Sequence, residues 1–114
     1  MPRRDPLVGL LHMRDYARKA VAMAVGQRRE DLDQDEKLRF ALTHVVSLIG
    51  EAAGRVAPEV QGLHPEIPWP KIISMRHRLI HGYDFVDCDI LWDTVMKDLP
   101  PLIMALEKIV GKEG

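Results

Sequence analysis

Apolar residues recur at spacings of three and four through two long stretches of this 114-residue chain. A helix turns by about 100° per residue, so this spacing places the apolar side chains on one helix face. Runs of alternating apolar and polar residues, the mark of strands, do not occur in the sequence, and aromatic residues make up only 5%. The pattern predicts an all-α chain. The clearest stripe consists of Leu38, Leu42, Val45, Leu48, Ile49, Ala52, Ala53 and Val56.

Capping residues and prolines set the expected ends of the helices. Asp5 and Pro6 have the character of an N-cap and a first helical residue, and Pro58 ends the second helix. Four prolines within residues 58–70 indicate a connector with one short helical turn at most. Short connectors between helices favour an up-and-down bundle of four or five helices in a single domain, residues 1–114. The expected helices span residues 6–26, 35–57, 71–82 with Gly82 at the helix end, and 87 or 89 to the C-terminus with a kink or an interruption at Pro100-Pro101.

Charge is close to balanced overall but uneven along the chain. The net charge is −1, which argues against a globally basic nucleic-acid binder. Residues 1–30 hold seven basic and three acidic residues, so the choice there lies between a basic patch and a solvated helix face. The single cysteine, Cys88, and the lack of any apolar run long enough to span a bilayer favour a cytoplasmic protein without a membrane partner.

The side chains best suited to catalysis are concentrated in residues 75–87, MRHRLIHGYDFVD. An arginine fork can grip a phosphate oxygen and neutralise the charge that develops on it. A histidine can take the proton from a ribose 2′-OH or return one to the leaving oxygen. Together they suffice for RNA cleavage without a metal, leaving a 2′,3′-cyclic phosphate. The segment therefore predicts cleavage of a phosphodiester bond.

On a continuous helix, the side chains of Arg76 and His81 would point in different directions. On one ideal helix they are separated by roughly 140°, whereas His77 and His81 are separated by about 40°. Either the helix end turns His81 toward Arg76, or a two-fold axis brings the arginine of one protomer to the histidine of the other. We favour the composite site across a homodimer, since a bundle of this size offers little internal cleft.

The motif Arg76-x4-His81-Gly82-Tyr83 resembles the Rx4HxY motif of the HepT-like toxins, a branch of the HEPN ribonuclease superfamily. Further short segments resemble that family in the same order, and together they cover roughly residues 36–105. They are Ile49-Gly50-Glu51-Ala52, Pro65-Glu66-Ile67-Pro68-Trp69, Asp89-Ile90-Leu91-Trp92 and Asp98-Leu99-Pro100.

The resemblance implies a homodimeric helical bundle that cuts RNA without a metal or cofactor. Arg76 would hold the scissile phosphate and His81 would act as acid or base. His77 stands where the family has a polar residue, often asparagine, and would support the site. The resemblance also implies a toxin–antitoxin pair, in which an MntA-like nucleotidyltransferase antitoxin adenylylates the motif tyrosine, here Tyr83. Attached AMP would add bulk and negative charge beside the arginine.

Alternative interpretations remain for the same residues. Glu51 interrupts an apolar helix and is expected either to be buried as a partner of Arg76 or His81, or to be a surface acid. His77 and His81 also have the spacing of metal ligands, although the flanking arginines would repel a cation. The alternative function is a non-catalytic helical module that docks a nucleotidyltransferase and binds nucleotide or RNA.

Overall fold

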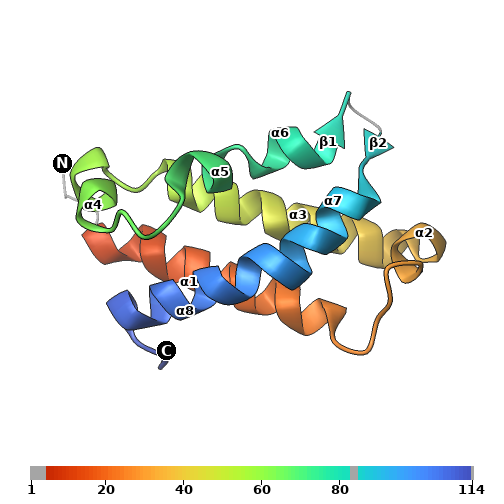
Figure 1. Ribbon diagram of the computed structural model, residues 1–114, viewed down its shortest axis with the longest axis horizontal. Coiled ribbons are helices and arrows are strands. Elements are labelled where there is room, and N and C mark those ends of the chain that lie inside the picture. Colours follow the sequence, from red (N-terminus) through yellow and green to blue (C-terminus); the bar gives the residue numbers. More distant parts are fainter. Residues whose placement is uncertain (1–4, 83–84, 114) are drawn as a thin grey trace.

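The computed structural model describes residues 5–82 and 85–113. Its two long helices, α1 (Pro6–Ala24) and α3 (Glu36–Gly54), lie side by side and antiparallel (Figure 1). Both begin at the predicted aspartates. The Asp5 carboxylate accepts a hydrogen bond of 2.9 Å from a backbone amide of the first turn, and Asp35 accepts one of 3.0 Å. These side chains satisfy amides that have no partner within the helix.

The segments on either side of α3 contain short helices. One, α2 (Asp31–Gln34), lies where the sequence predicted no element. The proline-rich connector forms α4 (Pro58–Leu63), the single short turn that was expected, and leads to α5 (Trp69–Ile73). The indole nitrogen of Trp69 donates to the carbonyls of Gln61 and His64 at 3.1 Å, which holds this connector in place.

The prediction of one continuous helix over residues 71–82 is wrong. The chain instead forms α5, a break at Ser74, α6 (Met75–Leu79), and a hairpin of β1 (Ile80–His81) and β2 (Phe85–Val86). The helix ends because the Leu79 carbonyl accepts a hydrogen bond of 2.8 Å from the amide of Asp87, on the other side of the hairpin. Gly82 has a φ of 71°, which favours glycine, but it serves the hairpin turn rather than a helix end.

The C-terminal part begins at α7 (Cys88–Asp93), continues through the π-helical turn η1 (Thr94–Asp98), and ends in α8 (Leu99–Val110). Pro100 and Pro101 lie in the first turn of α8, where missing amide hydrogens are tolerated. The predicted interruption is therefore confirmed, and the π-helical turn just before the prolines is the form it takes. Apart from the hairpin, the all-α prediction holds.

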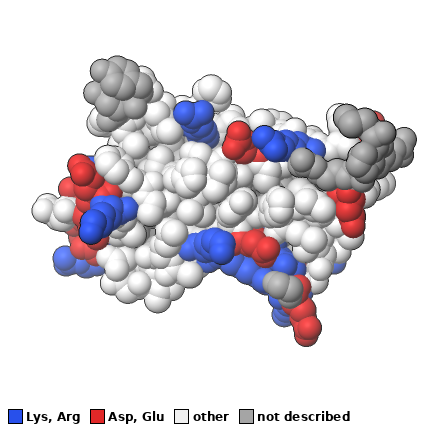
Figure 2. Space-filling view, turned by 180° about the vertical axis from the view of Figure 1, so that it is seen from behind, with Lys and Arg blue, Asp and Glu red and all other residues white. Residues whose placement is uncertain are grey.

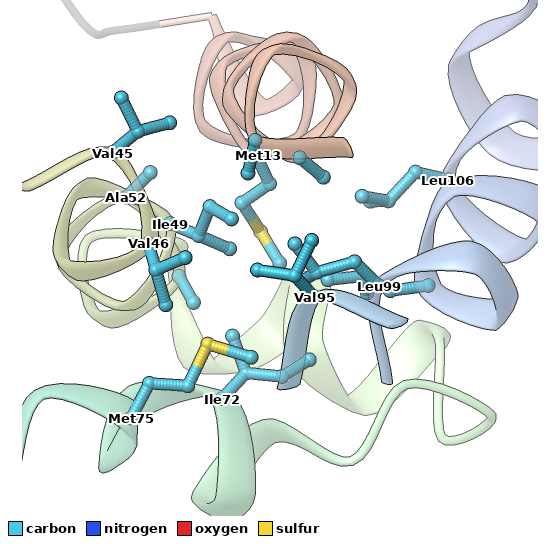
Figure 3. Packing of buried hydrophobic residues seen from close by; sticks show 14 of the residues in the cluster. Met13, Val45, Val46, Ile49, Ala52, Ile72, Met75, Val95, Leu99 and Leu106 are labelled. Carbon is cyan, nitrogen blue, oxygen red and sulfur yellow. The ribbon is translucent and has the colours of Figure 1, made fainter. Parts of the chain in front are cut away.

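The core lies where α1, α3, α5, α6, η1 and α8 meet (Figure 3). At Gly50 of α3, an added Cβ would lie 2.8 Å from the backbone oxygen of Ile72 in α5. Only a glycine permits this approach, which presses α5 and the following α6 against α3. Side chains within the core include Met13, Ile49, Ile72, Met75, Val95, Leu99 and Leu106.

The described N-terminal arginines do not form a free basic patch. Arg14 is 1% exposed and donates to the carbonyls of Gly111 and Glu113, each at 2.9 Å. Arg18 pairs with Glu107 at 2.7 Å. These arginines fix the chain terminus against α1, while Arg3 and Arg4 lie outside the described residues. Within the described ranges no helix has both the length and the apolar character needed to cross a membrane.

Candidate active site

A groove of about 650 Å³ runs between α3 and the α5–α6 segment. It gathers three of the residues that the sequence singled out, Arg76, His77 and Glu51. Its other lining side chains are mostly uncharged, and they include the exposed ring of Phe40 and the imidazole of His44. The close approach at Gly50 positions α6 along α3 and so forms this groove.

Two arginines lie on α6, Arg76 of the motif and Arg78. Arg76 is exposed, and no ion pair among residues 5–82 and 85–113 involves it. Arg78 is half-buried, and its Nη1 atom is buried without a hydrogen-bond partner in the described part of the chain. Two guanidinium groups on one short helix therefore keep their charge available for an anion.

Glu51 does not occupy the buried position that one interpretation assigned to it. It is exposed on α3, and none of the ion pairs within the described ranges joins it to Arg76 or His81. The reason is that Glu51 falls on the groove side of α3 rather than on the core face that carries Ile49 and Ala53. Its carboxylate shares the groove with Arg76 and is the surface acid of the two alternatives.

His81 lies on the hairpin rather than in the groove, since it is not among the described lining residues. Its Nε2 atom lies 3.9 Å from Oδ2 of Asp87, and its side chain is 55% exposed. Because α6 ends at Leu79, the expected shared helix face of His77 and His81 does not form. Within one chain, Arg76 thus lines the groove and His81 does not.

Asp87 and Phe85 are the neighbours of His81 that the sequence analysis did not assign to the site. Strand pairing places His81 opposite Phe85, and residues two apart along a strand share a face. The Asp87 carboxylate also caps α7, accepting a hydrogen bond of 3.0 Å from the amide of Ile90. The turn glycine at Gly82 between two short β-prone segments is the signal that indicates this hairpin. Tyr83 lies outside the described residues.

Neither the histidines nor the cysteine forms an obvious alternative centre. Within residues 5–82 and 85–113, no group of three or more His, Cys, Asp or Glu side chains is placed to hold a metal ion. Burial raises the pKa of the Cys88 thiol, which keeps it protonated and weakly nucleophilic. The segment from α6 to the hairpin carries two exposed groups that can act on a phosphate, Arg76 and His81.

A family model described as "Ribonuclease HepT-like" matches residues 13–109. The chain belongs to the HepT-like ribonuclease family. It is 42% identical over 80 residues to "Probable ribonuclease HepT" of Thermococcus cleftensis, covering 70% of this chain and 73% of that protein. It is 31% identical over 110 residues to "Putative RNase TTE0752" of Caldanaerobacter subterraneus, covering 96% and 98% of the two chains. No solved structure matches at a significant level.

Proposed function

We propose that this HepT-like chain is the toxin of a HEPN/MNT toxin–antitoxin pair and acts as a metal-independent endoribonuclease. The observation that carries the proposal is that a chain of a ribonuclease family exposes both a guanidinium, Arg76, with no ion pair among the described residues, and an imidazole, His81. The relatives named as ribonucleases support the same reaction class.

The proposed reaction is an internal transesterification. One imidazole removes the proton of the ribose 2′-OH as that oxygen bonds to phosphorus, and the bond to the 5′-oxygen breaks as a proton is returned to it. The products are a 2′,3′-cyclic phosphate and a 5′-hydroxyl. Arg76 neutralises the charge that grows on the non-bridging oxygens, and His77 beside it supports that contact.

A homodimer completes this site. Arg76 lines the groove while His81 lies on the hairpin, so one protomer supplies the guanidinium and its partner the imidazole. The surface beside Arg76 suits such a contact. Seen from behind, the centre of the molecule is largely free of charged side chains (Figure 2), and Phe40 on α3 is 56% exposed.

Mixing two inactive variants tests the composite site. Arg76→Ala and His81→Ala are unfolded together and refolded as a mixture, or co-expressed with different tags. A composite site is restored once in each mixed dimer, so the mixture regains about a quarter of the wild-type cleavage rate. If both groups act within one protomer, the mixed dimer stays inactive. Cleavage by the wild type in excess EDTA, and none by His81→Ala, tests the metal independence.

We further propose that a partner nucleotidyltransferase silences the toxin by adenylylating Tyr83. The tyrosine follows Gly82 directly and is two residues beyond the reacting imidazole in the sequence. An attached AMP would carry a phosphate that competes with the RNA phosphate for Arg76 and would exclude it from the site.

The alternative, a non-catalytic module that docks a nucleotidyltransferase and binds nucleotide or RNA, is favoured by the separation of Arg76 and His81 within one chain. It predicts RNA binding that depends on Arg76 without any cleavage by the wild type. The same preparations measured for binding and for cleavage distinguish the two functions.

A further inference from the structure

The outer face of the hairpin presents an aromatic ring beside the imidazole. Phe85 directly opposes His81 in the strand register, so both side chains project from the same face. Their ring centroids are 5.9 Å apart, with the planes inclined at 56°. The Phe85 ring is 57% exposed, which leaves much of its surface open to solvent.

The fold itself does not require an aromatic residue at this position. The opposite face of the hairpin, with Ile80 and Val86, packs against the core and anchors the two strands. Phe85 is absent from that cluster of described apolar residues. Its ring therefore adds exposed apolar surface directly beside the imidazole of His81.

We propose that Phe85 is a platform on which an unpaired base of the RNA stacks while His81 engages the adjoining ribose and phosphate. This inference rests on the proposed function and specifies its substrate as single-stranded RNA. A base inside a duplex already has neighbours on both faces, so only an unstacked base can cover the ring. A phenyl ring has no hydrogen-bond donor or acceptor, so the platform selects unpaired RNA without selecting a particular base.

Binding of an uncleavable strand isolates the stacking contact from the chemistry. The probe is a short single-stranded RNA with 2′-O-methyl groups throughout, which lacks the nucleophilic hydroxyl, and with 2-aminopurine at successive positions to report stacking by loss of fluorescence. Phe85→Leu keeps an apolar side chain but removes the ring, and Phe85→Trp keeps a ring. We expect Phe85→Leu to weaken binding about ten- to hundredfold and to abolish the quenching, while Phe85→Trp retains both.

A matched control separates stacking from general loss of exposed apolar surface. Leu63 on α4 is 73% exposed and lies at the opposite end of the molecule from the hairpin (Figure 1). Leu63→Ala is expected to bind and quench as the wild type does. Circular dichroism of each variant verifies that it is folded.

Three results overturn the inference. One is equal binding and quenching by Phe85→Leu and the wild type, and another is equal cleavage of paired and unpaired RNA. A third is a change in the oligomeric state of Phe85→Leu by light scattering, which assigns the ring to a protein interface instead. If the wild type binds the methylated strand through Phe85 but cuts no RNA, the platform stands and the proposed nuclease activity fails.

Discussion

One carboxylate, that of Asp87, lies beside His81 and caps the start of α7. Its Oδ2 atom lies 3.9 Å from Nε2 of His81, and its Oδ1 atom accepts the 3.0 Å hydrogen bond from the amide of Ile90. The helix cap therefore fixes the carboxylate at a set place beside the imidazole. Such a group can orient a reacting histidine without contacting the substrate.

Two substitutions separate the capping role of Asp87 from its positioning role. Asn is also a good N-cap, so Asp87→Asn keeps the stability of the fold within about 0.5 kcal/mol, whereas Asp87→Ala lowers it by about 1 kcal/mol. Both remove the charge beside His81 and are expected to reduce kcat for RNA cleavage by about ten- to hundredfold with little change in KM. Chemical denaturation and steady-state cleavage give the two readouts. A wild-type kcat for Asp87→Asn would show that the contact has no part in the reaction.

The close approach of α3 and α5 predicts that Gly50 cannot be replaced without moving the groove. The added Cβ of Gly50→Ala meets a backbone oxygen of Ile72 at 2.8 Å, and backbone cannot rotate away as a side chain can. We expect a loss of about 1–3 kcal/mol of unfolding free energy. The control is Gly54→Ala in the same helix, where nothing lies within 4 Å of the added atom. The unfolding free energy of this control should rise by up to about 1 kcal/mol.

Denaturant titration of the two glycine variants measures their unfolding free energies and so tests this prediction. Equal stability of Gly50→Ala and Gly54→Ala would contradict the close approach of α3 and α5. RNA cleavage measured at a temperature where both variants are folded then reports whether the position of α6, and with it Arg76, matters for activity.

Local chemistry made the helix starts predictable. Asp5 and Asp35 act within their own first turns, and the prolines act on their own backbone, so a sequence alone contains the relevant partners. The hairpin was missed because its strands have only two residues each, too few for an alternating pattern to show. Its key hydrogen bond joins Leu79 to Asp87, and the helical pattern before it gives no sign of that pairing.

For the candidate site, too, features set by neighbouring residues could be predicted from the sequence, and features set by tertiary packing could not. The motif residues could be named from spacing and resemblance, yet the groove that holds Arg76 depends on the packing of Gly50 against Ile72. Likewise, the charge count near the N-terminus left a basic patch and a solvated helix face open, because the partners of Arg14 lie at the other end of the chain. Burial and pairing across the fold are tertiary properties, so charge patterning alone does not give them.

Arg14 is therefore predicted to stabilise the fold rather than bind RNA. Arg14→Met keeps a long side chain but removes the hydrogen bonds to Gly111 and Glu113, and it should lower the unfolding free energy by about 2–4 kcal/mol. The matched control Arg28→Met changes an arginine that is 77% exposed and should stay within about 0.5 kcal/mol of the wild type. Below the unfolding temperature, both variants should bind RNA as the wild type does. Weakened binding by folded Arg14→Met would contradict this assignment.

The proposed modification of Tyr83 gives a prediction with an internal control, because the chain has only two tyrosines. Co-expression with the partner nucleotidyltransferase should add the mass of one or more AMP units to the wild type and to Tyr16→Phe, but not to Tyr83→Phe. Tyr16 lies half-buried on α1 and is not part of the motif in the sequence, so its loss should leave the acceptor intact. The modified protein should lose RNA cleavage, since the added phosphate neutralises the guanidinium groups that grip the substrate. An adduct on Tyr83→Phe, or full cleavage by modified wild type, would rule out control of the nuclease through this tyrosine.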